Sequence, residues 1–227
     1  MPEIIDCIFV STEPFTEPGR RKRSPHDCFW YCMDVNIYAT RLALLGFRDD
    51  ELPKPLLHVY RATEVVLRSE PMDDIVDFFI EIEWSPAAVE RTIEALDAIG
   101  ADAHARFLAA VHRYLKGRRA YKVARSDLDE VNEAIAKVAE EHLSEDILER
   151  RYGEFAIDGD DTDRKWRSIC LEAVRYMEGW TNIKRIPKGP HNDAELQKYF
   201  ASKPAIVQRL KQIEEDGSRP PQTSRWW

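Results

Sequence analysis

Apolar residues recur at intervals of three and four along most of this chain, most clearly in residues 71–117. The first stripe consists of Ile75, Phe78, Phe79 and Ile82, which stand at i, i+3, i+4 and i+7 and therefore share one face of a helix. Two further stripes follow at Val89, Ile93 and Leu96 and at Phe107, Leu108, Val111 and Leu115. The pattern predicts three consecutive amphipathic helices around one core.

The residues between these stripes are those that begin and end helices. Ser85 is suited to cap the second helix, and Pro86 fits its first position because proline lacks the N–H that would stay unpaired there. Gly100 is suited to end the second helix in the left-handed conformation, and Gly117 to end the third.

The rest of the chain is also mainly helical in pattern. Helices are predicted over residues 27–46, 55–69, 127–143, 144–152, 163–180, 193–200 and 204–216. For the helix over 27–46, the core candidates are Phe29, Met33, Ile37 and Leu44. Residues 4–10 and 180–186 are predicted to be two short strands that pair with each other.

These elements predict a mainly α protein, a compact multi-helix bundle with a minor β element and a C-terminal helical extension. We expect residues 1–50 to form an N-terminal strand, loop and helix that pack on the core. Residues 51–187 would form the helical core domain, and residues 188–227 the C-terminal extension and tail. No apolar run approaches the roughly 20 residues that a membrane-spanning helix needs, and no signal-peptide pattern opens the chain. We therefore expect a cytoplasmic protein that does not engage a membrane.

Charge is distributed unevenly over the 227 residues, whose formal net charge is −8. Residues 126–163 hold 14 acidic residues against three basic ones, a net charge of −11. The preceding residues 101–125 hold one acidic residue against seven basic ones, a net charge of +6. Such a distribution bears on partners and solubility rather than on fold. It favours a basic protein partner over direct binding of nucleic acid.

The acidic residues of the helix over 127–143 lie opposite its apolar side. We take Asp129, Glu130, Glu133, Glu140 and Glu141 as the candidate partner-binding residues. Asp129 and Glu133 lie roughly 6 Å apart along the helix axis, and Asp129 and Glu140 roughly 16 Å. A row of this kind is compatible with the spacing of charges along a DNA strand, about 3.4 Å per phosphate.

A secondary acidic face is predicted at Asp73, Asp77 and Glu81, which recur every four residues. These carboxylates suggest two functions: a face toward a cationic partner, or oxygen ligands for a divalent metal in a hydrolase. No histidine at helical spacing supports the metal, so no metal or cofactor is expected.

Other chemical signals in the sequence are weak. Cys28 and Cys32 lie four residues apart near His26, which is half of a zinc site, yet no second ligand pair follows at a suitable spacing. We therefore expect both cysteines to act as small buried apolar groups. No phosphate-binding loop, nucleophile elbow or zinc-protease motif is present. A non-enzymatic protein is the favoured interpretation.

One stretch resembles a known family. Residues 70–116, with Phe78-Phe79 and the segment from Glu94 to Ala101 (EALDAIGA), are similar to the helical domain of bacterial DNA-mimic proteins and their largely uncharacterised relatives. The segment from Ser126 to Glu130 resembles the acidic start of that family's following helix, so the similarity spans roughly residues 55–166. Met72-Asp73-Asp74 departs from the family pattern, which has Asn-Gly-Gly at that turn.

The resemblance implies an all-α fold without catalytic activity. It also implies that carboxylates replace DNA phosphates in front of a DNA-binding protein. Two alternatives remain open: an immunity or antitoxin protein that neutralises a toxin, and the metal-dependent hydrolase. A second copy of the chain is a further candidate partner, and the terminal Trp226 and Trp227 are candidates to dock into a groove of this or another copy.

Overall fold

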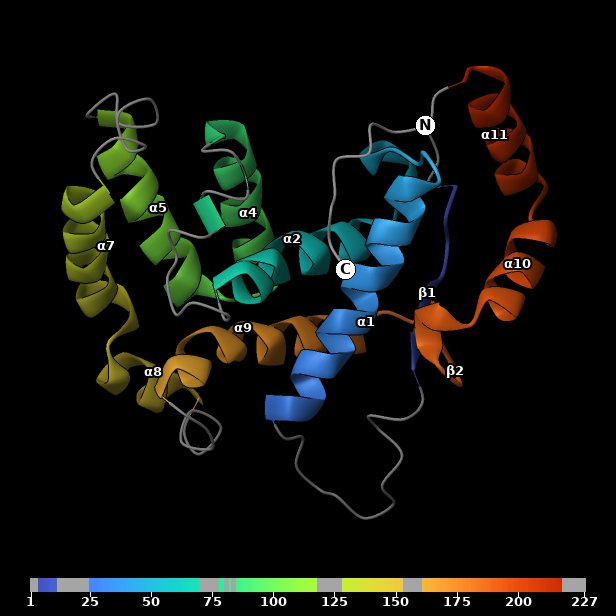
Figure 1. The fold of residues 1–227 in the computed structure, drawn as a ribbon. Coiled ribbons are helices and arrows are strands. Elements are labelled where there is room, and N and C mark those ends of the chain that lie inside the picture. The colour runs from blue at the N-terminus through green and yellow to red at the C-terminus, as the bar shows by residue number, and fades with distance from the viewer. Residues whose placement is uncertain are drawn as a thin grey trace, which may run out of the picture.

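The computed structural model describes residues 4–11, 25–69, 78, 79, 82, 85–117, 128–152 and 161–217. Its elements are mostly helices, and the predicted mainly α fold is confirmed. Figure 1 shows them arranged in a row, from α7 and α5 at one end to α10 and α11 at the other.

The predicted helical core is a set of helices that pack on one another in turn. α7 (Leu128–Leu143) packs against α5 (Asp102–Gly117), and α5 packs against α4 (Pro86–Ala98). α4 in turn packs against α2 (Lys54–Ser69). The short helix α8 (Glu145–Tyr152) connects α7 to the next element.

The centre of the molecule is α9 (Asp161–Glu178), which packs against both α2 and α1 (Pro25–Leu44). The buried side of α9 follows the apolar period of its sequence. Its members are all at most 4 % exposed: Trp166, Ile169, Cys170, Ala173 and Met177.

A two-stranded parallel sheet lies beside α1. β1 (Ile8–Ser11) pairs with β2 (Ile183–Ile186), with Ile8 opposite Ile183. The predicted pairing of the two short strands is thus confirmed, although β1 begins later than expected. Parallel strands need a long crossover, and here the helices from α1 to α9 supply it.

The C-terminal helices α10 (Asp193–Ala201) and α11 (Pro204–Glu215) follow β2 through the 3-10 helix η4 (Gly189–His191). Polar contacts connect these helices to the N-terminal segment. The Tyr199 hydroxyl donates to Asp6 Oδ1 at 2.6 Å, and Lys203 Nζ lies 2.6 Å from Asp6 Oδ2. Burial alone would raise the pKa of Asp6, but the hydrogen bonds from Lys203 and Tyr199 outweigh it and leave that pKa below its usual value.

Local signals at α4 behave as predicted. The Ser85 hydroxyl accepts a hydrogen bond from the Ala88 N–H, and Pro86 occupies the first turn. Gly100 has φ +84°, the left-handed conformation that ends a helix.

The predicted core face of α1 is wrong for most of its residues. Leu44 is half exposed, and Met33 and Ile37 are only partly buried, whereas the partly buried Phe29 does pack against the core. The helix instead buries its other side: Cys28, Tyr31, Cys32, Val35, Tyr38, Ala39 and Leu42. Because α1 has apolar residues on nearly every side, its sequence did not determine which side would meet α9, α2 and β1.

Candidate partner-binding surface

Helix α7 has one buried side and one exposed side. Ile135, Ala139 and Leu143 are buried on the side that meets α5. Glu133, Glu140 and Glu141 are exposed, and we call these three residues the acidic face. The division follows the amphipathic pattern of the sequence, in which apolar and acidic residues alternate with the helical period.

The remaining predicted acidic residues are less fully described. The backbones of Asp129 and Glu130 belong to the first turn of α7, but their side chains lie outside the described set. Asp73, Asp77 and Glu81 all lie outside the described residues, as does the Trp226–Trp227 end.

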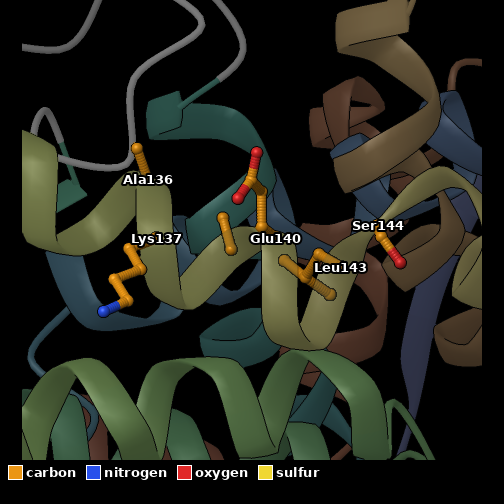
Figure 2. A pocket seen from close by; sticks show the side chains of 6 residues that line it. Ala136, Lys137, Glu140, Leu143 and Ser144 are labelled. Carbon is orange, nitrogen blue, oxygen red and sulfur yellow. The ribbon is translucent and has the colours of Figure 1, made fainter.

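An open groove of about 450 Å³ runs along α7 next to the acidic face. Figure 2 shows Ala136 and the Glu140 carboxylate on the same side of the helix, while Lys137 extends away from that carboxylate. Leu143 and Ser144 line the groove near the end of α7. Lys137 lines the groove as well, so the surface combines one carboxylate and one cation with apolar side chains.

The basic residues of α5 do not neutralise the acidic face in the described part of the chain. Lys116 Nζ lies 3.4 Å from Glu90 Oε1 on α4, and His112 Nε2 lies 3.3 Å from the same oxygen. Among the ion pairs between described residues, none involves Glu133, Glu140 or Glu141. Lys137 is the one Lys or Arg in the sequence of α7, and it lies between Glu133 and Glu140.

The geometry of the acidic face suits attraction of a positive surface. Glu133 and Glu140 are seven residues apart, so they lie about 10 Å apart along the axis on the same side of α7. Like charges this close in water repel only weakly and are screened by salt over about 8 Å at physiological ionic strength. The carboxylates can therefore act jointly on a cationic partner.

Metal binding has no support in the part of the chain that the structure describes. No three His, Cys, Asp or Glu side chains gather there as a metal site. Cys28, Cys32 and Cys170 are buried, as expected for small apolar groups. Burial, reinforced by the neighbouring Cys170, holds the pKa of Cys32 well above its usual value, so this thiol stays protonated and unreactive.

One buried polar pair escaped the sequence analysis. The Ser168 hydroxyl on α9 lies 3.3 Å from His104 Nε2 on α5, next to the ring of Trp166. Serine and histidine at this distance are the parts of a nucleophile and its base. Both side chains are about 1 % exposed, however, so a substrate has no access and the pair serves to join two helices. Their separation of 64 residues left no signal in the sequence.

No known protein family, curated protein or solved structure matches this chain. Within the described residues, no helix is both long enough and apolar enough to cross a membrane.

Proposed function

We propose that this chain is a non-enzymatic binding protein whose acidic face engages a basic, DNA-binding protein in place of DNA. One observation carries the proposal: Glu133, Glu140 and Glu141 are exposed together on α7, and in the described region the nearby Lys116 pairs with α4 instead. A row of exposed carboxylates that has no ion pair among the described residues attracts a surface that normally binds phosphates. The motifs by which residues 55–166 resemble bacterial DNA-mimic proteins favour the same proposal, although no family model matches the chain.

The test is affinity capture from an extract of the source organism, followed by elution with duplex DNA. The immobilised full-length chain should retain a basic protein that duplex DNA releases, because both compete for one surface. The Glu133→Lys/Glu140→Lys/Glu141→Lys variant should lose that protein.

A matched control is Glu214→Lys/Glu215→Lys/Asp216→Lys, which changes the net charge equally at exposed residues near the end of α11. It should retain the partner. Equal loss with both variants would mean that net charge alone acts, and would contradict the assignment to α7. Retention of the partner by the α7 variant would contradict it as well.

A further inference from the structure

Helix α1 carries a line of apolar residues on its exposed side, which Thr40 and Arg41 interrupt between Ile37 and Leu44. Trp30 is 47 % exposed and Leu44 is 50 % exposed. Met33 and Ile37 lie between them and are only partly buried. The four residues stand at i, i+3, i+7 and i+14, so they follow one line along the helix over about 21 Å. We call these four residues the α1 stripe.

The α1 stripe differs from ordinary scattered exposure. Among the described residues, the large apolar side chains that stand exposed are Trp30, Leu44 and Leu45, and all three lie on α1 or directly after it. Singly exposed apolar residues are common on protein surfaces, whereas an aligned group marks a surface that another segment covers.

The course of the chain brings its C-terminal end to this stripe. α11 returns to the end of α1, where Arg209 Nη2 donates to the Gly46 carbonyl at 3.4 Å. Ile213 packs there as well, since a Cβ atom on Gly46 would lie 2.9 Å from its side chain. Gly217, the last described residue, is only four residues beyond Ile213. The chain therefore leaves the described structure close to the Leu44 end of the stripe.

The ten residues after Gly217 have the length and the chemistry to cover the stripe. Residues 218–227 reach at most about 33 Å, which exceeds the stripe's length of about 21 Å. They end in Trp226 and Trp227, whose rings offer large apolar surfaces with little conformational freedom to lose. We propose that the α1 stripe is the binding surface for the Trp226–Trp227 end of the same chain.

Binding within one chain has an advantage over binding to a second copy. A short tether holds its end near the stripe at an effective concentration on the order of millimolar. At micromolar protein concentration, the chain's own end therefore outcompetes that of another copy.

Hydroxyl-radical footprinting of the full-length protein tests this proposal. The Trp226→Ser/Trp227→Ser variant should show oxidation of Trp30 and Leu44 raised about twofold, because aromatic anchors contribute most of such contacts. Oxidation of the buried Trp166 should stay low in both proteins, which shows that the variant is folded. The Gln222→Ala/Ser224→Ala variant keeps both tryptophans and should match the parent protein.

The reciprocal variant Trp30→Ser/Leu44→Ser should raise oxidation of Trp226 and Trp227. Unchanged oxidation in both variants would overturn the proposal. Sedimentation velocity distinguishes a second copy as the occupant: a dimer that becomes a monomer in either variant would assign the stripe to a neighbouring chain and overturn binding within one chain.

Discussion

The guanidinium Nε of Arg209 on α11 lies 2.6 Å from Oε1 of Glu51, a carboxylate with a side chain only 3 % exposed. The other Glu51 oxygen accepts the Arg48 N–H at 2.8 Å. Both oxygens of this buried carboxylate thus have partners, and one of them comes from a helix 158 residues away in sequence. The pair connects the C-terminal helices to the turn that follows α1.

Replacement of Arg209 by methionine should destabilise the protein by about 2 kcal/mol, because the buried Glu51 carboxylate would lose its nearer cation and keep Arg48, whose Nε lies 3.7 Å from Oε2. Urea unfolding measures the change. Lys211→Met removes an exposed cation from the same helix and should have little effect. The double variant Arg209→Met/Glu51→Gln should be more stable than Arg209→Met alone. If its loss of unfolding free energy instead equals the sum of the losses of the two single variants, the pairing is contradicted.

A second prediction concerns Gly189, which has φ +47° and lies against β1. A Cβ atom there would overlap the Ser11 backbone nitrogen, so Gly189→Ala combines left-handed strain with a clash against a buried strand. We expect a loss of more than about 2 kcal/mol in unfolding free energy.

Gly100→Ala is the matched control, since its φ of +84° is also left-handed but no atom lies within 4 Å of the added Cβ. Its cost should stay near 1 kcal/mol, from strain alone. If Gly189→Ala and Gly100→Ala lose the same unfolding free energy, the close contact with β1 is not what requires glycine at residue 189.

The sequence predicted the helices well and the faces of one helix poorly. α9 alternates apolar and charged residues, so its buried side followed from periodicity. α1 is apolar nearly all round, and its orientation depends on how α9, α2 and β1 enclose it, which no local pattern encodes. Phe29, Met33, Ile37 and Leu44 were therefore predicted to be core and instead form or flank the exposed side.

For the candidate surface too, some features could be predicted from the local sequence and others could not. Exposure of Glu133, Glu140 and Glu141 followed from the amphipathic pattern of α7. The pairing of Lys116 with Glu90 depends on how α4 and α5 cross, and the pairing of Arg209 with Glu51 on contacts between distant segments. Periodicity predicts which side of a helix is exposed to solvent, but it does not predict which charged residues form ion pairs between two helices.

A third prediction follows from His58 on α2, whose Nδ1 lies 2.9 Å from the Tyr176 hydroxyl on α9. Burial lowers the pKa of His58, and the nearby Arg61 and Lys54 lower it further. The unfolded chain, where histidine has a pKa of about 6.5, then binds a proton more readily than the folded protein. Stability should therefore fall as the pH drops below about 6.5.

Urea unfolding between pH 5 and pH 8, with His58→Gln as the variant, isolates this contribution. The variant should lose part of the pH dependence. Tyr176→Phe removes the hydrogen bond but keeps the burial and both cations that lower the pKa of His58, so most of the pH dependence should remain. A parent protein equally stable across this pH range would contradict the prediction.

The last prediction concerns Lys137, the cation that lies between Glu133 and Glu140 on α7. If the acidic face binds a basic partner, Lys137 weakens the attraction, and Lys137→Glu should tighten binding of the captured protein. An exposed charge contributes about 0.2–1 kcal/mol, so the dissociation constant should fall several-fold at low salt. The gain should shrink as salt is added, because screening weakens long-range attraction.

Lys211→Glu makes the same charge change on α11 and should leave the affinity nearly unaltered. The dissociation constants of the parent protein, Lys137→Glu and Lys211→Glu should be measured by titration at two salt concentrations. An effect of net charge would change both variants equally, whereas local attraction would change only Lys137→Glu.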